Sequence, residues 1–124
     1  MKKILVIDDD PDLRTLMELT MRKQGYEVES ASGKAEAFRK LSSFQPHVIL
    51  LDVLLSGDDG RELCKEIKSM EAYRNLPVIM ISAHPGATAN ISGYGADDFI
   101  TKPIRTELLM KKIQSLVLEK DKNL

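Results

Sequence analysis

The sequence places several acidic residues immediately after its first apolar run. The stretch VIDDDPD supplies carboxylates at Asp8, Asp9, Asp10 and Asp12, and Asp52 follows a later apolar run. Two carboxylates about 4 Å apart repel each other by about 4 kcal/mol at an effective dielectric constant near 20. A divalent cation between them removes this repulsion, and hard oxygen ligands favour Mg²⁺ over Zn²⁺. We therefore treat three residues as candidate Mg²⁺ ligands: Asp8, Asp9 and Asp52.

Two further polar side chains stand at the ends of later apolar runs. Ser82 follows the run VIMI, and Lys102 follows the short run FIT and precedes Pro103. In open α/β sheets, ligands bind beyond the carboxyl ends of the strands, where the winding direction reverses. We therefore expect the hydroxyl of Ser82 and the ammonium group of Lys102 to share one site with the carboxylates.

The elements that must position these residues alternate along the chain. Apolar runs without alternation are typical of strands covered on both faces, as in a parallel sheet. The predicted strands are Ile4–Ile7, Tyr26–Ala31, Val48–Leu51, Val78–Ile81 and Phe99–Thr101. Segments with helical periodicity lie between them, and the first begins with Asp10 as N-cap and Pro11 as first helical residue. The alternation predicts an α/β domain with right-handed crossovers.

Composition limits the possible functions. The 124 residues suit one domain, which we assign to residues 1–124 with a frayed tail at 119–124. The net charge of −1 gives no support for binding to nucleic acid or to a membrane surface, both of which favour clustered basic residues. Cys64 is the only cysteine, which excludes an internal disulfide and indicates a cytoplasmic location.

Four segments, in this order, resemble the response-regulator receiver domain of two-component signalling: ILVIDDDPD, VILLDVLLSGDDG, VIMISA and GADDFITKP. The resemblance covers essentially the whole chain. It implies a flavodoxin-like fold, which is a doubly wound, five-stranded parallel sheet of strand order 2-1-3-4-5 with helices on both faces. It also implies a Mg²⁺-dependent phosphoacceptor that relays a signal by protein–protein contact. Such a domain is not an enzyme beyond its own phosphorylation and slow autodephosphorylation.

The resemblance assigns roles to the acidic residues. Asp52 is expected to take a phosphoryl group from a histidine kinase or a histidine phosphotransfer protein. Asp9 is expected to bind Mg²⁺ directly and Asp8 largely through water, and the backbone carbonyl of Leu54 is expected to supply a further ligand. Repulsion among the three carboxylates also suggests that Asp9→Ala stabilises the metal-free protein by on the order of 1 kcal/mol.

The resemblance also assigns the remaining polar groups. Lys102 and Ser82 are expected to bind phosphoryl oxygens, with a cis peptide bond before Pro103. Ser82 and Phe99 are expected to act as switch residues, and Leu54 and His84 to set the dephosphorylation rate.

The sequence departs from the family pattern in two segments. Ser56 stands where the family usually has a proline, which predicts a less rigid loop after Asp52. The segment Pro85–Gly95 holds three glycines, each of which costs up to about 1 kcal/mol relative to alanine in a helix. We therefore expect a short or partly unwound helix there, with high mobility before phosphorylation.

Two other functions compete with this interpretation. A haloacid-dehalogenase-like phosphatase would use Asp8 as nucleophile and Asp10 as second acid, but the chain lacks room for a cap over the substrate and Asp52 would have no role. The third hypothesis is a receiver-like binding module that works without phosphoryl transfer. Such a module usually lacks one of the acids or the lysine, and this sequence keeps all of them.

The expected partners are a kinase or phosphotransfer protein and an unknown downstream protein, with no nucleic acid and no membrane. The expected state is a monomer or weak homodimer.

Overall fold

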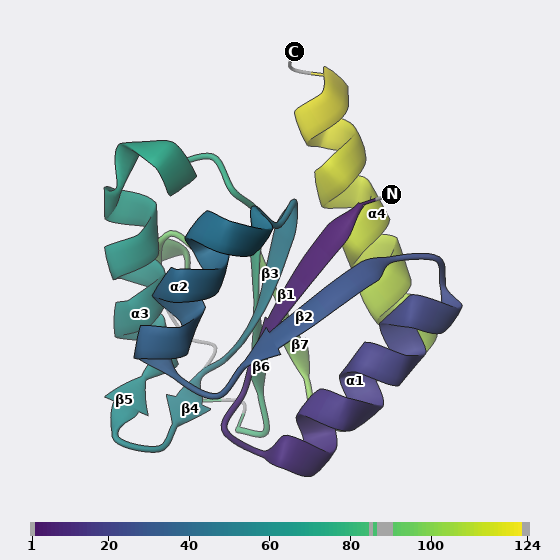
Figure 1. Ribbon diagram of the computed structural model, residues 1–124, viewed down its shortest axis with the longest axis horizontal. Helices are drawn as coiled ribbons and strands as arrows, with labels where there is room; N and C mark the ends of the chain where they lie inside the picture. Colours follow the sequence, from purple (N-terminus) through teal and green to yellow (C-terminus); the bar gives the residue numbers. More distant parts are fainter. Residues whose placement is uncertain (1, 85, 87–90, 123–124) are drawn as a thin grey trace.

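The computed structural model describes residues 2–84, 86 and 91–122. Its main sheet is parallel and has the order β2-β1-β3-β6-β7 (Figure 1). The strands are β1 (Lys3–Ile7), β2 (Glu27–Ala31), β3 (Val48–Asp52), β6 (Val78–Ser82) and β7 (Asp98–Thr101). This arrangement confirms the expected flavodoxin-like fold with strand order 2-1-3-4-5.

Helices cover both faces of the sheet. Helices α2 and α3 lie on one face and α1 and α4 on the other (Figure 1). The helices are α1 (Pro11–Lys23), α2 (Lys34–Phe44), α3 (Gly60–Ser69) and α4 (Thr106–Lys122), with short 3₁₀ turns η1 (Glu71–Tyr73) and η3 (Ile91–Tyr94). None of the helices described is long and apolar enough to cross a membrane.

The first helix begins as the sequence predicts. The side chain of Asp10 accepts hydrogen bonds from the N–H groups of Asp12 (2.9 Å) and Leu13 (3.4 Å), and Pro11 occupies the first helical position. These contacts satisfy N–H groups that have no partner within the helix. Asp10 is therefore a capping residue, and its carboxylate is not part of the acidic cluster described below.

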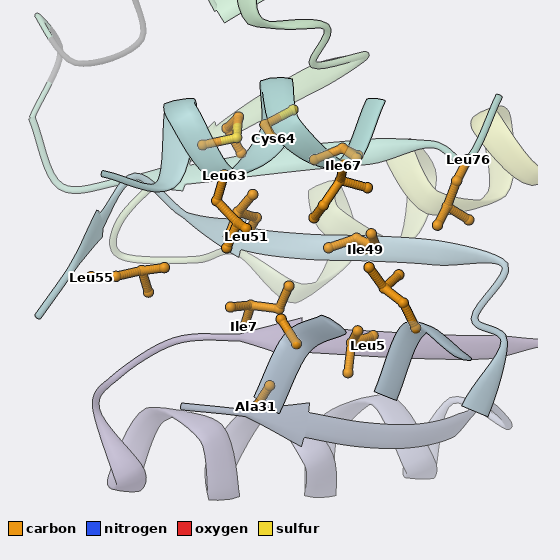
Figure 2. Packing of buried hydrophobic residues seen from close by; sticks show 14 of the residues in the cluster. Leu5, Ile7, Ala31, Ile49, Leu51, Leu55, Leu63, Cys64, Ile67 and Leu76 are labelled. Atoms are coloured by element: carbon orange, nitrogen blue, oxygen red, sulfur yellow. The ribbon is translucent and has the colours of Figure 1, made fainter. Parts of the chain in front are cut away.

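Apolar residues of the central strands fill two separate cores. Leu5 and Ile7 pack into the cluster under α2 and α3, whereas Ile4 and Val6 pack into the cluster under α1 and α4. Figure 2 shows the first cluster, in which Leu63, Cys64 and Ile67 of α3 lie over Leu51 and Ile49 of β3. Each such aliphatic side chain contributes about 1.5–3 kcal/mol when fully buried. Burial on both faces explains why these strands read as continuous apolar runs.

A small antiparallel hairpin follows β3, and the sequence did not predict it. It consists of β4 (Leu54–Leu55) and β5 (Asp58–Asp59), joined by the two residues Ser56 and Gly57. Gly57 has φ 78°, a conformation that glycine adopts without steric penalty. Two-residue strands are too short to show a hydrophobic period, so the hairpin leaves no pattern in the sequence.

Two sequence-based predictions fall partly outside the described residues. In the segment Pro85–Gly95, residues 85 and 87–90 are not described, and the described part holds the 3₁₀ turn η3 followed by Gly95 at φ 90°. The short or unwound helix therefore stays a prediction. Helix α4 continues through Lys122, and residues 123–124 lie outside the described part, so fraying of the tail at 119–124 also stays a prediction.

Candidate functional site

The register of the sheet brings the candidate residues to one edge. Ile7 pairs with Leu51, so Asp8 and Asp52 follow at the same level of neighbouring strands. At the other side of β3, β6 ends at Ser82, which pairs with Thr101. Lys102 comes next after Thr101, and its N–H donates to the carbonyl of Ser82 at 2.9 Å. The carboxyl ends of four strands thus place the predicted groups together, as the sequence indicated.

Three carboxylates meet at this edge. Asp8, Asp9 and Asp52 each present an oxygen, and these oxygens lie within 4.8 Å of one another. Asp8 and Asp52 are buried, with 2% and 6% of their surface exposed, and Asp9 is partly buried. Several carboxylate oxygens in this arrangement match the ligand preference of a hard divalent cation such as Mg²⁺.

Lys102 contacts two of the three acids. Its Nζ lies 3.2 Å from Oδ2 of Asp52 and 3.7 Å from Oδ2 of Asp8. The peptide bond between Lys102 and Pro103 is cis, as expected. The other oxygen of Asp52, Oδ1, accepts a hydrogen bond from the N–H of Leu54 at 3.2 Å. Both oxygens of the Asp52 carboxylate are therefore fixed in place, one by a cation and one by the backbone of the hairpin.

The carboxyl group of Asp8 has a raised pKa. Its pKa is about 6, mainly because the group is buried and also because the Asp52 carboxylate lies close to it. The N–H of Asp10, which donates to Oδ1 of Asp8 at 2.9 Å, and the ammonium group of Lys102 oppose this shift. The charged form of Asp8 is thus destabilised relative to an exposed carboxylate in the absence of a metal.

Asp9 is stabilised as a carboxylate by Ser56. The hydroxyl and the N–H of Ser56 both donate to Oδ2 of Asp9, at 2.6 and 3.0 Å, and they lower the pKa of Asp9. The gain in stability expected for Asp9→Ala stays a prediction, and the raised pKa of Asp8 indicates that neutralising Asp8 should also stabilise the metal-free protein. In the sequence, Ser56 stands out only because the family usually has a proline there. Its role as a donor depends on the hairpin, which the sequence did not reveal.

Four further candidates lie at different places. The Ser82 hydroxyl is buried in the site, where it donates to the carbonyl of His84 and accepts from the N–H of His84, both at 3.0 Å. His84 itself is exposed. Phe99 is 41% exposed on β7, and Nζ of Lys112 lies 5.8 Å from the centroid of its ring. Leu54 is 56% exposed next to Asp52.

Two further residues at the site were not indicated by the sequence. Gly60 is buried at the start of α3, and a Cβ added to it would lie 1.9 Å from the backbone oxygen of Asp52. Arg14 donates from Nη1 to the backbone oxygen of Asp8 at 2.7 Å. Nothing in the sequence around Gly60 indicates this close approach. Arg14 stands six residues after Asp8, and only the packing of α1 against β1 brings the two together.

The chain is similar to a known family over most of its length. A family model described as the response regulator receiver domain matches residues 4–114. A structure of a putative response regulator from Chloroflexus aurantiacus has 29% sequence identity and a TM-score of 0.88, and the match covers 94% of this chain and 98% of that chain.

Two other solved structures are similar to a comparable degree. The chemotaxis protein CheY4 of Vibrio cholerae has 30% identity and a TM-score of 0.87, with 94% of this chain and 98% of that chain covered. The receiver domain of NtrX from Brucella abortus has 32% identity and a TM-score of 0.84, with 92% and 97% covered. In each case the similarity spans nearly the whole of both chains.

Proposed function

The chain belongs to the response regulator receiver family and is a phosphoacceptor signalling domain, and within it we propose that Asp52 is the residue that takes the phosphoryl group. The observation that carries this assignment is the position of its carboxylate. Oδ2 lies 3.2 Å from the ammonium group of Lys102, and Oδ1 accepts the N–H of Leu54. A nucleophile held between a cation and a backbone donor is oriented for attack on phosphorus.

The proposed step is an in-line transfer from a phosphohistidine. An oxygen of the Asp52 carboxylate forms a bond to phosphorus while the phosphorus–nitrogen bond of the donor breaks. The imidazole nitrogen of the donor keeps the electron pair of that bond and takes up a proton from water. The ammonium group of Lys102 pairs with the phosphoryl oxygens, because phosphoryl transfer depends mainly on positioning and on neutralising charge.

The residues present fit a Mg²⁺ ion. The three carboxylate oxygens lie within 4.8 Å of one another, and burial, together with the nearby Asp52 carboxylate, destabilises the charged form of Asp8, which a divalent cation would offset. Asp8, Asp9, Asp52 and the backbone carbonyl of Leu54 would hold the ion. When bound, Mg²⁺ supplies positive charge to the phosphoryl oxygens.

Ser82 and Phe99 complete the proposal as switch residues. The Ser82 hydroxyl now donates to the carbonyl of His84, so binding a phosphoryl oxygen requires that it release this acceptor. Phe99 is exposed on the neighbouring strand, which leaves it able to rotate inward. Leu54 and His84 are both exposed beside the site, which supports a role in controlling access of water to the phosphoryl group.

The alternative functions are not favoured. A phosphatase that used Asp8 as its nucleophile would leave Asp52 without a role, although Lys102 lies closer to Asp52, at 3.2 Å, than to Asp8, at 3.7 Å. A binding module without phosphoryl transfer has no need for three convergent acids and a lysine in contact with two of them.

The family implies a histidine kinase or a histidine phosphotransfer protein as the donor. We propose that the signal then passes to a downstream protein by contact, without direct binding of nucleic acid. The monomeric or weakly dimeric state, and the cytoplasmic location inferred from the single cysteine, also remain part of this proposal.

Phosphorylation by acetyl phosphate tests the assignment. We expect a mass increase of one phosphoryl group that requires Mg²⁺, maps to Asp52 and disappears in Asp52→Asn. Asp58→Asn is the matched control, because Asp58 is an exposed acid on the adjacent hairpin. An adduct at Asp8, or one that persists in Asp52→Asn, contradicts the proposal.

A further inference from the structure

Ser56, in the loop of the hairpin, donates two hydrogen bonds to Asp9. Its hydroxyl lies 2.6 Å and its backbone nitrogen 3.0 Å from the same carboxylate oxygen, Oδ2. The two residues are 47 positions apart in the sequence, so this contact is a tertiary one that joins the loop of the hairpin to the end of β1. Oδ1 of Asp9 takes no part in either bond.

The hairpin gives Ser56 a fixed position from which to donate. Leu54 pairs with Asp59 and Leu55 with Asp58, and Ser56 and Gly57 form the two-residue connection between them. The backbone of Leu54 is also anchored at the site, where its N–H donates to Asp52. The same short segment therefore contacts two of the three carboxylates, Asp52 through Leu54 and Asp9 through Ser56.

Asp9 needs such a contact more than the other two acids do. Asp8 and Asp52 are buried and lie within 4 Å of Lys102, whereas Asp9 is only partly buried. A partly exposed carboxylate on a loop has several rotamers and is well hydrated, and ordering it opposes metal binding by the entropy that is lost. Two donors on one oxygen restrict the side chain to a single orientation.

We propose that Ser56 is a positioning residue for Asp9 and thereby sets the affinity of the acidic site for Mg²⁺. The proposal rests on the proposed function, in which Asp9 is a metal ligand. Ligating carboxylates are commonly hydrogen-bonded by neighbouring groups, and loss of such a partner weakens metal binding by about 10- to 100-fold. The hydrogen bonds of Ser56 hold Oδ2 of Asp9 in place, so that the Asp9 carboxylate keeps one orientation relative to Asp8 and Asp52.

A purely structural role makes a different prediction. If Ser56 only closes the hairpin loop, its hydroxyl stabilises the fold and Mg²⁺ affinity does not depend on it. If its hydrogen bonds compete with the metal, Ser56→Ala binds Mg²⁺ more tightly than the wild type. The positioning role alone predicts weaker binding by the alanine variant and recovery when a hydroxyl is restored.

The test is a titration of the full chain with MgCl₂, followed by amide chemical shifts at constant ionic strength. We expect the dissociation constant for Mg²⁺ to rise about tenfold in Ser56→Ala, near the lower end of the usual range because the backbone N–H remains. Ser56→Thr, which keeps a hydroxyl, should bind within about threefold of the wild type. Ser69→Ala is the matched control, because its hydroxyl is exposed and bonds only within its own helix, to the carbonyl of Glu66.

A double-mutant cycle with Asp9→Asn shows whether Ser56 changes the Mg²⁺ affinity through Asp9. If Ser56 acts through Asp9, Ser56→Ala should change the residual Mg²⁺ affinity of Asp9→Asn by less than twofold. Unchanged or tighter binding by Ser56→Ala in the wild-type background overturns the inference while leaving the phosphoacceptor assignment intact. Failure of the wild type to bind Mg²⁺ at all overturns both the inference and the metal site of the proposed function.

Discussion

The three carboxylates of the site repel one another, and each has different neighbours that offset this repulsion. Asp52 pairs with Lys102 at 3.2 Å, and Asp9 accepts two hydrogen bonds from Ser56. Asp8 is the most buried of the three, and its contact with Lys102 is longer, at 3.7 Å. The electrostatic strain expected from the sequence is therefore concentrated at Asp8.

The raised pKa of Asp8 predicts a specific dependence of stability on pH. Its folded-state pKa is about 6, against about 3.9 in an unfolded chain, so the folded protein binds the proton more tightly. The resulting stabilisation is fully present below about pH 4 and is lost as the pH rises through about 6. The difference amounts to at most about 3 kcal/mol, and to less where water screens the site.

Urea unfolding with EDTA at pH 4.5 and pH 7.5 measures this effect. Other carboxylates also titrate near the lower pH, so the informative quantity is the difference between the wild type and Asp8→Asn. We expect Asp8→Asn to be the more stable protein at pH 7.5 and to lose that advantage toward pH 4.5. An advantage that does not change with pH would show that Asp8 is not the strained group.

At the scale of elements, the junction between β3 and α3 determines where the Asp52 backbone lies. The N–H of Gly60 donates to the carbonyl of Val53 at 2.7 Å, and no side chain fits between Gly60 and the backbone oxygen of Asp52. The start of the helix thus packs directly against the strand end that carries the nucleophile.

Substitution of Gly60 should disturb both the fold and the site. A Cβ at this position would overlap backbone atoms that have little freedom to move, so we expect Gly60→Ala to lower the free energy of unfolding by about 1–3 kcal/mol. The rate of labelling by acetyl phosphate should fall as well. Gly33→Ala is the control, because a Cβ at Gly33 meets nothing within 4 Å. Equal stability of the two variants would contradict the close approach.

The sequence predicted the larger elements better than the small ones. Runs such as Val48–Leu51 identify buried strands because both of their faces meet a core, and Asp10-Pro11 identifies a helix start by its capping chemistry. The two-residue strands of the hairpin have no such signal. The convergence of Asp8, Asp9 and Asp52 was predictable because these residues stand at the ends of long buried strands. The hydrogen bonds that Ser56 donates to Asp9 were not predictable, because Ser56 lies in the short hairpin.

At the scale of the whole molecule, the acidic site and the fold are thermodynamically linked. The three acids stand at the ends of β1 and β3, two neighbouring inner strands of the sheet whose side chains contribute to both cores. A ligand that binds the folded chain and not the unfolded one stabilises it by RT ln(1 + [L]/Kd). Mg²⁺ binding should therefore be visible as global stability, independently of phosphorylation.

We expect the thermal stability of the protein to rise with MgCl₂ once the site begins to saturate, by about 1.4 kcal/mol for each further tenfold increase in concentration. The gain should be larger at pH 7.5 than at pH 5, because Mg²⁺ binds ionised carboxylates and Asp8, with a pKa of about 6, is mostly protonated at the lower pH. Thermal unfolding followed by circular dichroism measures both trends, with KCl at matched ionic strength as the control. Asp9→Asn should lose most of the gain, whereas Asp58→Asn should keep it. Equal stabilisation by KCl and MgCl₂ would mean that Mg²⁺ acts only by screening charge and that the three carboxylates do not form a metal site.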